Sequence, residues 1–93
     1  MNYHVEFRPV TKRQVARLPR QVQVELGGLV EKLMAEPRFR GIKPVTGRPG
    51  VLRARVGDYR VLFKIDETRR VVIVGRVAPR DRVYKRLSDL RLD

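Results

Sequence analysis

Apolar and polar residues alternate near the start of the chain and again through its second half. Tyr3, Val5 and Phe7 alternate with polar neighbours, which predicts a short strand ending before Pro9. Residues 51–56, 59–65 and 71–78 are rich in β-branched and aromatic side chains and are separated by turn residues. They predict three consecutive strands that form a meander.

Between the first strand and the meander, apolar residues recur at helical spacing. Thr11 is expected to cap a short helix that runs to Leu18, and Pro19 to open a longer helix that stops at Pro37. Residues 38–50 show no periodicity and are expected to form a long surface loop. Beyond Pro79, helical spacing predicts a short C-terminal helix with three apolar positions: Val83, Leu87 and Leu90.

The element order is β-α-α-β-β-β with a short tail helix. Helices at one end of the sequence and a meander at the other predict an α+β fold, in which the helix pair covers one face of a small antiparallel-rich sheet. A chain of 93 residues is long enough for one modest core, so a single domain over residues 1–93 is expected.

The predicted hairpin around Gly57 and Asp58 sorts its side chains onto two faces. A two-residue turn pairs the flanking strands so that one face is apolar: Leu52, Ala54, Val56, Tyr59, Val61 and Phe63. Side chains alternate along a strand, so the other face gathers four bases: Arg53, Arg55, Arg60 and Lys64. Continued into the next strand, the alternation places Ile73 and Val77 in the core, and Arg76, Val72 and Val74 on the basic face. Those two valines and Leu62 would then need cover from the tail helix or a partner.

The charge of the chain is one-sided. There are 22 Lys and Arg residues against 10 Asp and Glu, a formal net charge of +12. Between residues 38 and 64 the only acid is Asp58, against these bases: Arg38, Arg40, Lys43, Arg48, Arg53, Arg55, Arg60 and Lys64. Most of the bases are arginine, which binds phosphate in a planar, bidentate way. An anionic partner is expected, either a nucleic acid or an acidic protein.

Metal and disulfide chemistry are not indicated. The chain has no cysteine and a single histidine, His4, which has no obvious partner for a zinc site. No cofactor is expected. The start of the sequence lacks an apolar signal region and no run is long enough to span a membrane, so a cytoplasmic protein is expected.

The stretch "LRARVGDYRVLFKID", the valine-rich strand after it and the segment "RVAPRDRVYKRL" resemble the RelE/ParE superfamily of toxin–antitoxin toxins, and its RelE branch more closely. The resemblance covers essentially the whole chain. It implies a RelE-like fold and an endoribonuclease that cuts mRNA in the ribosomal A site until a cognate antitoxin neutralises it. It also implies an active site made of five residues: Arg53, Arg55, Arg60, Arg80 and Tyr84.

These residue types suit attack of a ribose 2′-hydroxyl on the adjacent phosphate. Arginines stabilise the growing negative charge, but a guanidinium is a poor general base. Tyr84 and Asp81 are both candidates for moving protons, and Lys64 and Lys85 are weaker ones. Further bases are expected to bind RNA around this centre: Lys43, Arg48, Lys64, Arg76, Arg82 and Lys85.

Two other functions remain open. The ParE branch shares the fold but is linked to DNA gyrase, and it generally lacks the C-terminal arginine and tyrosine set that Arg80, Arg82 and Tyr84 match here. A non-catalytic nucleic-acid-binding module would also explain the charge, although few aromatic residues are available for stacking. An antitoxin with an acidic, amphipathic helix is the expected protein partner.

Overall fold

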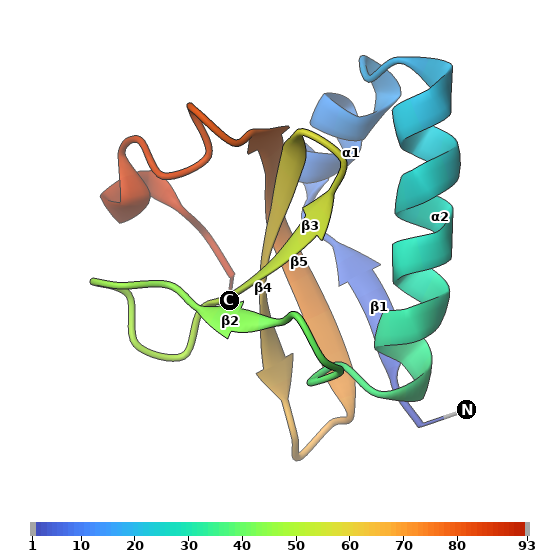
Figure 1. Ribbon diagram of the computed structural model, residues 1–93. Coiled ribbons are helices and arrows are strands. Elements are labelled where there is room, and N and C mark those ends of the chain that lie inside the picture. Colours follow the sequence, from blue (N-terminus) through green and yellow to red (C-terminus); the bar gives the residue numbers. More distant parts are fainter. Residues whose placement is uncertain (1, 93) are drawn as a thin grey trace.

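The computed structural model describes residues 2–92 as two helices packed on one face of a five-stranded sheet (Figure 1). The helices are α1 (Pro9–Ala16) and α2 (Arg20–Ala35). The strands are β1 (His4–Phe7), β2 (Lys43–Pro44), β3 (Leu52–Val56), β4 (Tyr59–Asp66) and β5 (Val71–Pro79). This arrangement confirms the predicted α+β fold.

The sheet has the strand order β1-β5-β4-β3-β2. β1 runs parallel to β5, whereas the other pairs are antiparallel. β2 lies within the segment that was expected to lack regular structure, and it pairs with β3 through Lys43 opposite Arg53. The first helix also begins earlier than predicted. Pro9 opens it and Thr11 is buried inside it rather than capping it.

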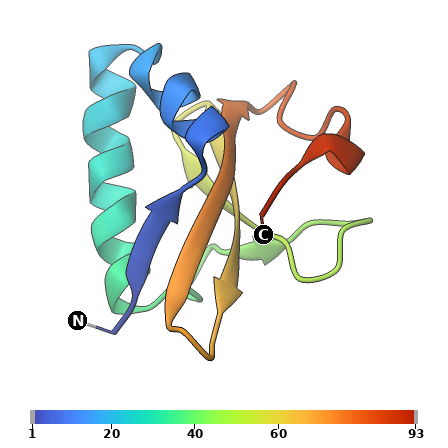
Figure 2. The same ribbon diagram turned by 180° about the vertical axis from the view of Figure 1, so that it is seen from behind.

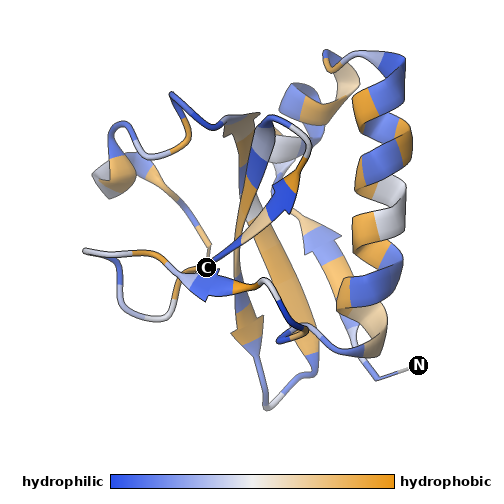
Figure 3. Cartoon of the chain, in the orientation of Figure 1, coloured by the Kyte–Doolittle hydropathy of each residue, from blue (hydrophilic) through white to orange (hydrophobic). Residues whose placement is uncertain are grey.

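The main core lies between the helices and the sheet. Leu26, Leu29 and Leu33 of α2 pack against apolar residues of β3, β4 and β5, including the fully buried Phe63. Figure 3 shows the central strands β4 and β5 as mostly apolar and α2 as alternating between apolar and polar residues. No helix within residues 2–92 is long and apolar enough to cross a bilayer.

The opposite face of the sheet is covered by the C-terminal tail and the loop that follows β2, as the reverse view shows (Figure 2). The predicted short C-terminal helix is a three-residue 3-10 helix, η1 (Leu87–Asp89), and turns precede it. The apolar residues of the tail close a second cluster: Val45, Val51, Leu62, Val71, Ile73, Val83, Leu90 and Leu92.

The predicted faces of β5 are wrong for three valine or isoleucine positions. Val72 and Val74 face the helices, while Ile73 belongs to the second cluster. The reason is a bulge at Gly75, since Leu62 pairs with Arg76 but Phe63 pairs with Val74. Val77 does lie in the main core, because it follows the bulge. Leu62 does lie on the basic side, as predicted, and the tail covers it completely.

Gly75 also makes room for the tail. A Cβ placed there would lie 2.7 Å from the carbonyl oxygen of Arg91 and would collide with the side chain of Leu92. We expect Gly75→Ala to displace the tail and to lower the free energy of unfolding by about 1–3 kcal/mol. A urea titration measures the loss.

Gly27→Ala is the matched control for that substitution. Gly27 lies in α2, and a Cβ there would have no neighbour within 4 Å. The same chemical change should therefore stabilise the protein by about 0.5–1 kcal/mol, because alanine favours a helix over glycine. Equal effects of the two substitutions would contradict the role assigned to Gly75.

Candidate active site

The β3–β4 hairpin places three arginines on the face opposite the helices. Leu52 pairs with Phe63, Ala54 with Val61 and Val56 with Tyr59, as the two-residue turn predicted. Gly57 opens that turn with φ of +57°, a value that favours glycine. The intervening pairs are Arg53 with Leu62 and Arg55 with Arg60. Arg53, Arg55 and Arg60 therefore share one surface.

Arg60 is the most enclosed of these cations, with 9% of its surface exposed. Its Nη1 atom donates hydrogen bonds to the carbonyl oxygens of Gly57, at 3.1 Å, and Tyr59, at 2.9 Å. Within residues 2–92 its Nε and Nη2 atoms have no hydrogen bond. The hairpin turn thus fixes the guanidinium and leaves donors for a ligand.

Positive charges crowd around Arg60. Burial lowers the pKa of its guanidinium below the ordinary value, and the charges of Arg55, Arg53 and Arg80 lower it further. The phenol of Tyr84 acts in the opposite direction. The other four residues of the predicted active site therefore all lie close enough to Arg60 to affect its pKa. An anion in this position would relieve their mutual repulsion.

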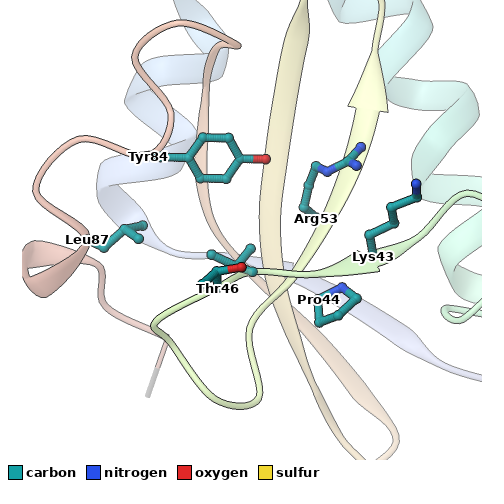
Figure 4. A pocket seen from close by; sticks show the side chains of 7 residues that line it. Lys43, Pro44, Thr46, Arg53, Tyr84 and Leu87 are labelled. Carbon is teal, nitrogen blue, oxygen red and sulfur yellow. The ribbon is translucent and has the colours of Figure 1, made fainter.

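A hollow of about 400 Å³ opens beside this cluster. Residues of three segments line the hollow. They are Lys43, Pro44, Val45 and Thr46 from β2 and the loop after it, Arg53 from β3, and Tyr84 and Leu87 from the tail. Figure 4 shows the Tyr84 ring reaching in from the tail, with its hydroxyl directed toward Arg53. A phenol and a guanidinium thus face the same space.

The tail brings Arg80 to the hairpin. The backbone N–H of Arg80 donates to the carbonyl oxygen of Asp58, at 2.9 Å, so the tail leaves β5 alongside the β3–β4 turn. Asp81 is exposed and pairs loosely with Arg82, with 4.0 Å between Oδ1 and Nε. Lys85 is exposed on the same loop.

Other predicted RNA-binding residues lie elsewhere or are already engaged. Arg48 and Arg76 bind backbone carbonyl oxygens of the tail. Lys64 borders a different hollow, formed with Arg48 and the last residues of the tail. Arg55 of the predicted catalytic set lies at the margin of the basic face, because it also borders a hollow that Glu25 of α2 helps to line.

The prediction from sequence missed part of the lining. Pro44, Val45 and Thr46 come from a segment without periodicity, and they meet the site only because β2 pairs with β3. Leu87 was expected as an apolar position of a helix but not as part of the hollow. The one available signal was Lys43, a base beside Pro44 in the charged loop.

Comparison with known proteins gives a consistent result. A family model described as the ParE toxin of type II toxin–antitoxin systems, parDE, matches residues 5–84. Toxin RelG of Mycobacterium tuberculosis is 34% identical over 91 residues, which span 92% of this chain and 100% of that protein.

Solved structures agree with both matches. The RelE–RelB complex of Pyrococcus horikoshii OT3 aligns with a TM-score of 0.77 at 25% identity, covering 89% of this chain and 100% of that one. The toxin–antitoxin complex RelBE2 of Mycobacterium tuberculosis aligns with a TM-score of 0.74 at 31% identity, covering 86% and 100%. The chain therefore belongs to the ParE toxin family within the RelE/ParE superfamily, and it is the toxin of a type II toxin–antitoxin system.

Proposed function

We propose that this toxin is a ribosome-dependent endoribonuclease that cleaves mRNA in the A site and thereby stops translation in the cytoplasm. The observation that supports this function best is the meeting of Arg53 and Tyr84 at one hollow, with Arg60 close enough for both to affect its pKa. A phosphate in that hollow would lie beside Arg53 and near the other cations of the cluster, and the Tyr84 hydroxyl, which is able to exchange protons, would face it.

The reaction requires three contributions at the scissile phosphate. A base removes the proton of the ribose 2′-hydroxyl, cations stabilise the phosphorane, and an acid protonates the departing 5′-oxygen. Four arginines stabilise the phosphorane without a metal ion: Arg53, Arg55, Arg60 and Arg80. Arg60 suits it especially, because its orientation is fixed before RNA arrives.

The geometry favours Tyr84 over Asp81 for proton transfer. Tyr84 faces the hollow, with 43% of its surface exposed, whereas Asp81 lies on the exposed side of the tail near Arg82. Lys64 and Lys85 are absent from the lining of this hollow. We assign the proton transfer to Tyr84.

The matching family model names ParE toxins, so action on DNA gyrase is the second candidate function. Purified toxin added to ribosomes programmed with a defined message should cut the message in the A-site codon, and free RNA should stay intact. The same preparation should leave gyrase supercoiling unchanged. Inhibition of gyrase with an intact message would replace the proposed function by the ParE-like one.

We also propose a cognate acidic antitoxin as the neutralising partner. The net charge of +12 favours an acidic protein, and several similar solved structures are toxin–antitoxin complexes. Such a partner would neutralise the toxin by covering or rearranging the cluster around Arg60. Co-expression of the antitoxin should restore translation.

Lys43 offers a test of RNA binding apart from chemistry. It is exposed at the rim of the hollow, opposite Arg53 in the β2–β3 pair. We expect Lys43→Gln to raise KM severalfold, to leave kcat nearly unchanged and to reduce the salt dependence of binding by about one phosphate contact.

Lys12→Gln is the control for Lys43→Gln, because Lys12 is an exposed lysine on α1. It removes the same charge from the helical side of the molecule. Equal effects of the two variants would mean that overall charge, rather than a contact at the hollow, governs binding.

A further inference from the structure

Three backbone carbonyl oxygens of the tail converge on one side chain, Arg76 of β5. Its Nη1 atom donates to the carbonyl oxygens of Val83, at 2.8 Å, and Lys85, at 2.7 Å. Its Nη2 atom donates to the carbonyl oxygen of Arg86, at 3.2 Å. Both terminal nitrogens are therefore occupied within the chain itself, which leaves little capacity to bind RNA phosphate.

The backbone of the tail is shaped around this guanidinium. Arg86 adopts a left-handed conformation, with φ of 52° and ψ of 50°, which is unfavourable for a residue with a side chain. This turn lets the carbonyl oxygens of Lys85 and Arg86 point toward the same arginine. Such a conformation persists only where surrounding contacts hold it.

A second arginine holds the next part of the tail. Arg48 donates to the carbonyl oxygens of Leu87 and, at 3.4 Å, Leu90. Burial lowers the pKa of Arg76, Asp89 raises it and Arg48 lowers it, so the two arginines share one environment with Asp89. The backbone of the tail between residues 83 and 90 is thus fastened to β5 by Arg76 and to the loop after β2 by Arg48.

Tyr84 lies between two of these anchored positions. The carbonyl oxygens before and after it, those of Val83 and Lys85, both bind Nη1 of Arg76, and the Val83 side chain is fully buried. The backbone of Tyr84 consequently has little freedom, although its own side chain is exposed at the hollow. This anchoring limits the directions in which the phenol can point.

We propose that Arg76 is a positioning residue, which holds Tyr84 over the hollow beside Arg53 by binding the carbonyl oxygens of Val83, Lys85 and Arg86. The effect on cleavage rests on the proposed function, in which Tyr84 transfers a proton. The effect on the position of Tyr84 does not rest on it. Two separate measurements can therefore test the two effects.

The first measurement is ¹⁹F NMR of the whole toxin labelled with fluorotyrosine. The chain has three tyrosines, and the Tyr84 signal is the one that disappears in Tyr84→Phe. Arg76→Gln should shift or broaden that signal and leave those of Tyr3 and Tyr59 in place. Arg20→Gln, at the start of α2, should move none of them. An unchanged Tyr84 signal in Arg76→Gln would overturn the proposal.

The second measurement is a double-mutant cycle on ribosome-dependent cleavage. Arg76→Gln should lower kcat about tenfold or more in the presence of Tyr84, because a displaced phenol no longer reaches the reacting group. It should cause no further loss in the Tyr84→Phe background. Equal losses in both backgrounds would show that Arg76 acts on RNA directly and would overturn the proposal.

Arg76→Lys keeps the measurements informative if Arg76→Gln fails to fold. An ammonium retains the charge but cannot span three carbonyl oxygens as the planar fork does. Arg76→Lys should therefore shift the ¹⁹F signal of Tyr84 less than Arg76→Gln does. It should also lower kcat by a smaller factor, and again only when Tyr84 is present. If the unmodified toxin cleaves no message, the proposed function fails, whereas the NMR result still decides whether Arg76 positions Tyr84.

Discussion

Replacing Arg60 by alanine is expected to lower the rate of message cleavage by about 100- to 1000-fold. Arg60 lies at the centre of the basic cluster, and two carbonyl oxygens of the hairpin turn fix its orientation. A donor that is already in place pays no reorganisation cost when charge develops on the phosphate. Most of the loss should therefore appear in kcat rather than in KM.

Arg60→Lys separates charge from geometry. The ammonium keeps the positive charge but loses the planar arrangement of donors, so it should recover only a small part of the lost rate. A full recovery would mean that Arg60 contributes charge alone.

The Arg60 variants need a folding check, because alanine leaves the carbonyl oxygens of Gly57 and Tyr59 without this donor. Removing those bonds should cost about 1 kcal/mol, which a urea titration can measure. Arg69→Ala, in the exposed β4–β5 turn, is the control and should retain the cleavage rate. Full activity in folded Arg60→Ala and in Arg80→Ala would refute the assignment of this cluster as the phosphate site.

The place of the hairpin arginines could be predicted from sequence because it depends on local rules. A two-residue turn fixes which residues pair, and alternation then fixes the face of every side chain. Arg53, Arg55 and Arg60 obey both rules in the structure. No knowledge of distant segments was needed to bring them together.

The faces of β5 could not be obtained by continuing the same alternation. One extra residue at Gly75 places every preceding side chain of β5 on the opposite face. Val72 and Val74 therefore lie in the main core, and Ile73 lies in the second cluster. A glycine inside a valine-rich strand is itself a signal for a bulge, so this error could have been anticipated. The role of Arg76 could not, because its partners are backbone atoms of an irregular tail.

The residues of the site also differ in how far the sequence predicts their positions. The cations come from a regular hairpin, whereas Tyr84 comes from a tail whose path depends on Gly75, Arg48 and Arg76. Sequence motifs can therefore indicate that Tyr84 is available, but only the folded tail directs its hydroxyl toward Arg53. The proton-transfer step should accordingly be the more sensitive one to changes outside the hollow.

Replacing Tyr84 by phenylalanine is expected to lower kcat about 100-fold with little change in KM. The substitution removes only the hydroxyl, so the ring can still line the hollow with Leu87. Because the hydroxyl that moves the proton is lost while the cations remain, the loss should appear in the chemical step. Single-turnover cleavage rates on programmed ribosomes, compared with binding of the same message, would show it.

Tyr59→Phe provides the matched control, because it removes the same hydroxyl from a tyrosine that packs on the helix side of the hairpin. It should leave kcat unchanged. Asp81→Asn tests the competing base, and we expect it to keep most of the activity because Asp81 is exposed near Arg82. If Asp81→Asn abolished cleavage while Tyr84→Phe retained it, the base would be Asp81, and Tyr84 would serve only to shape the hollow.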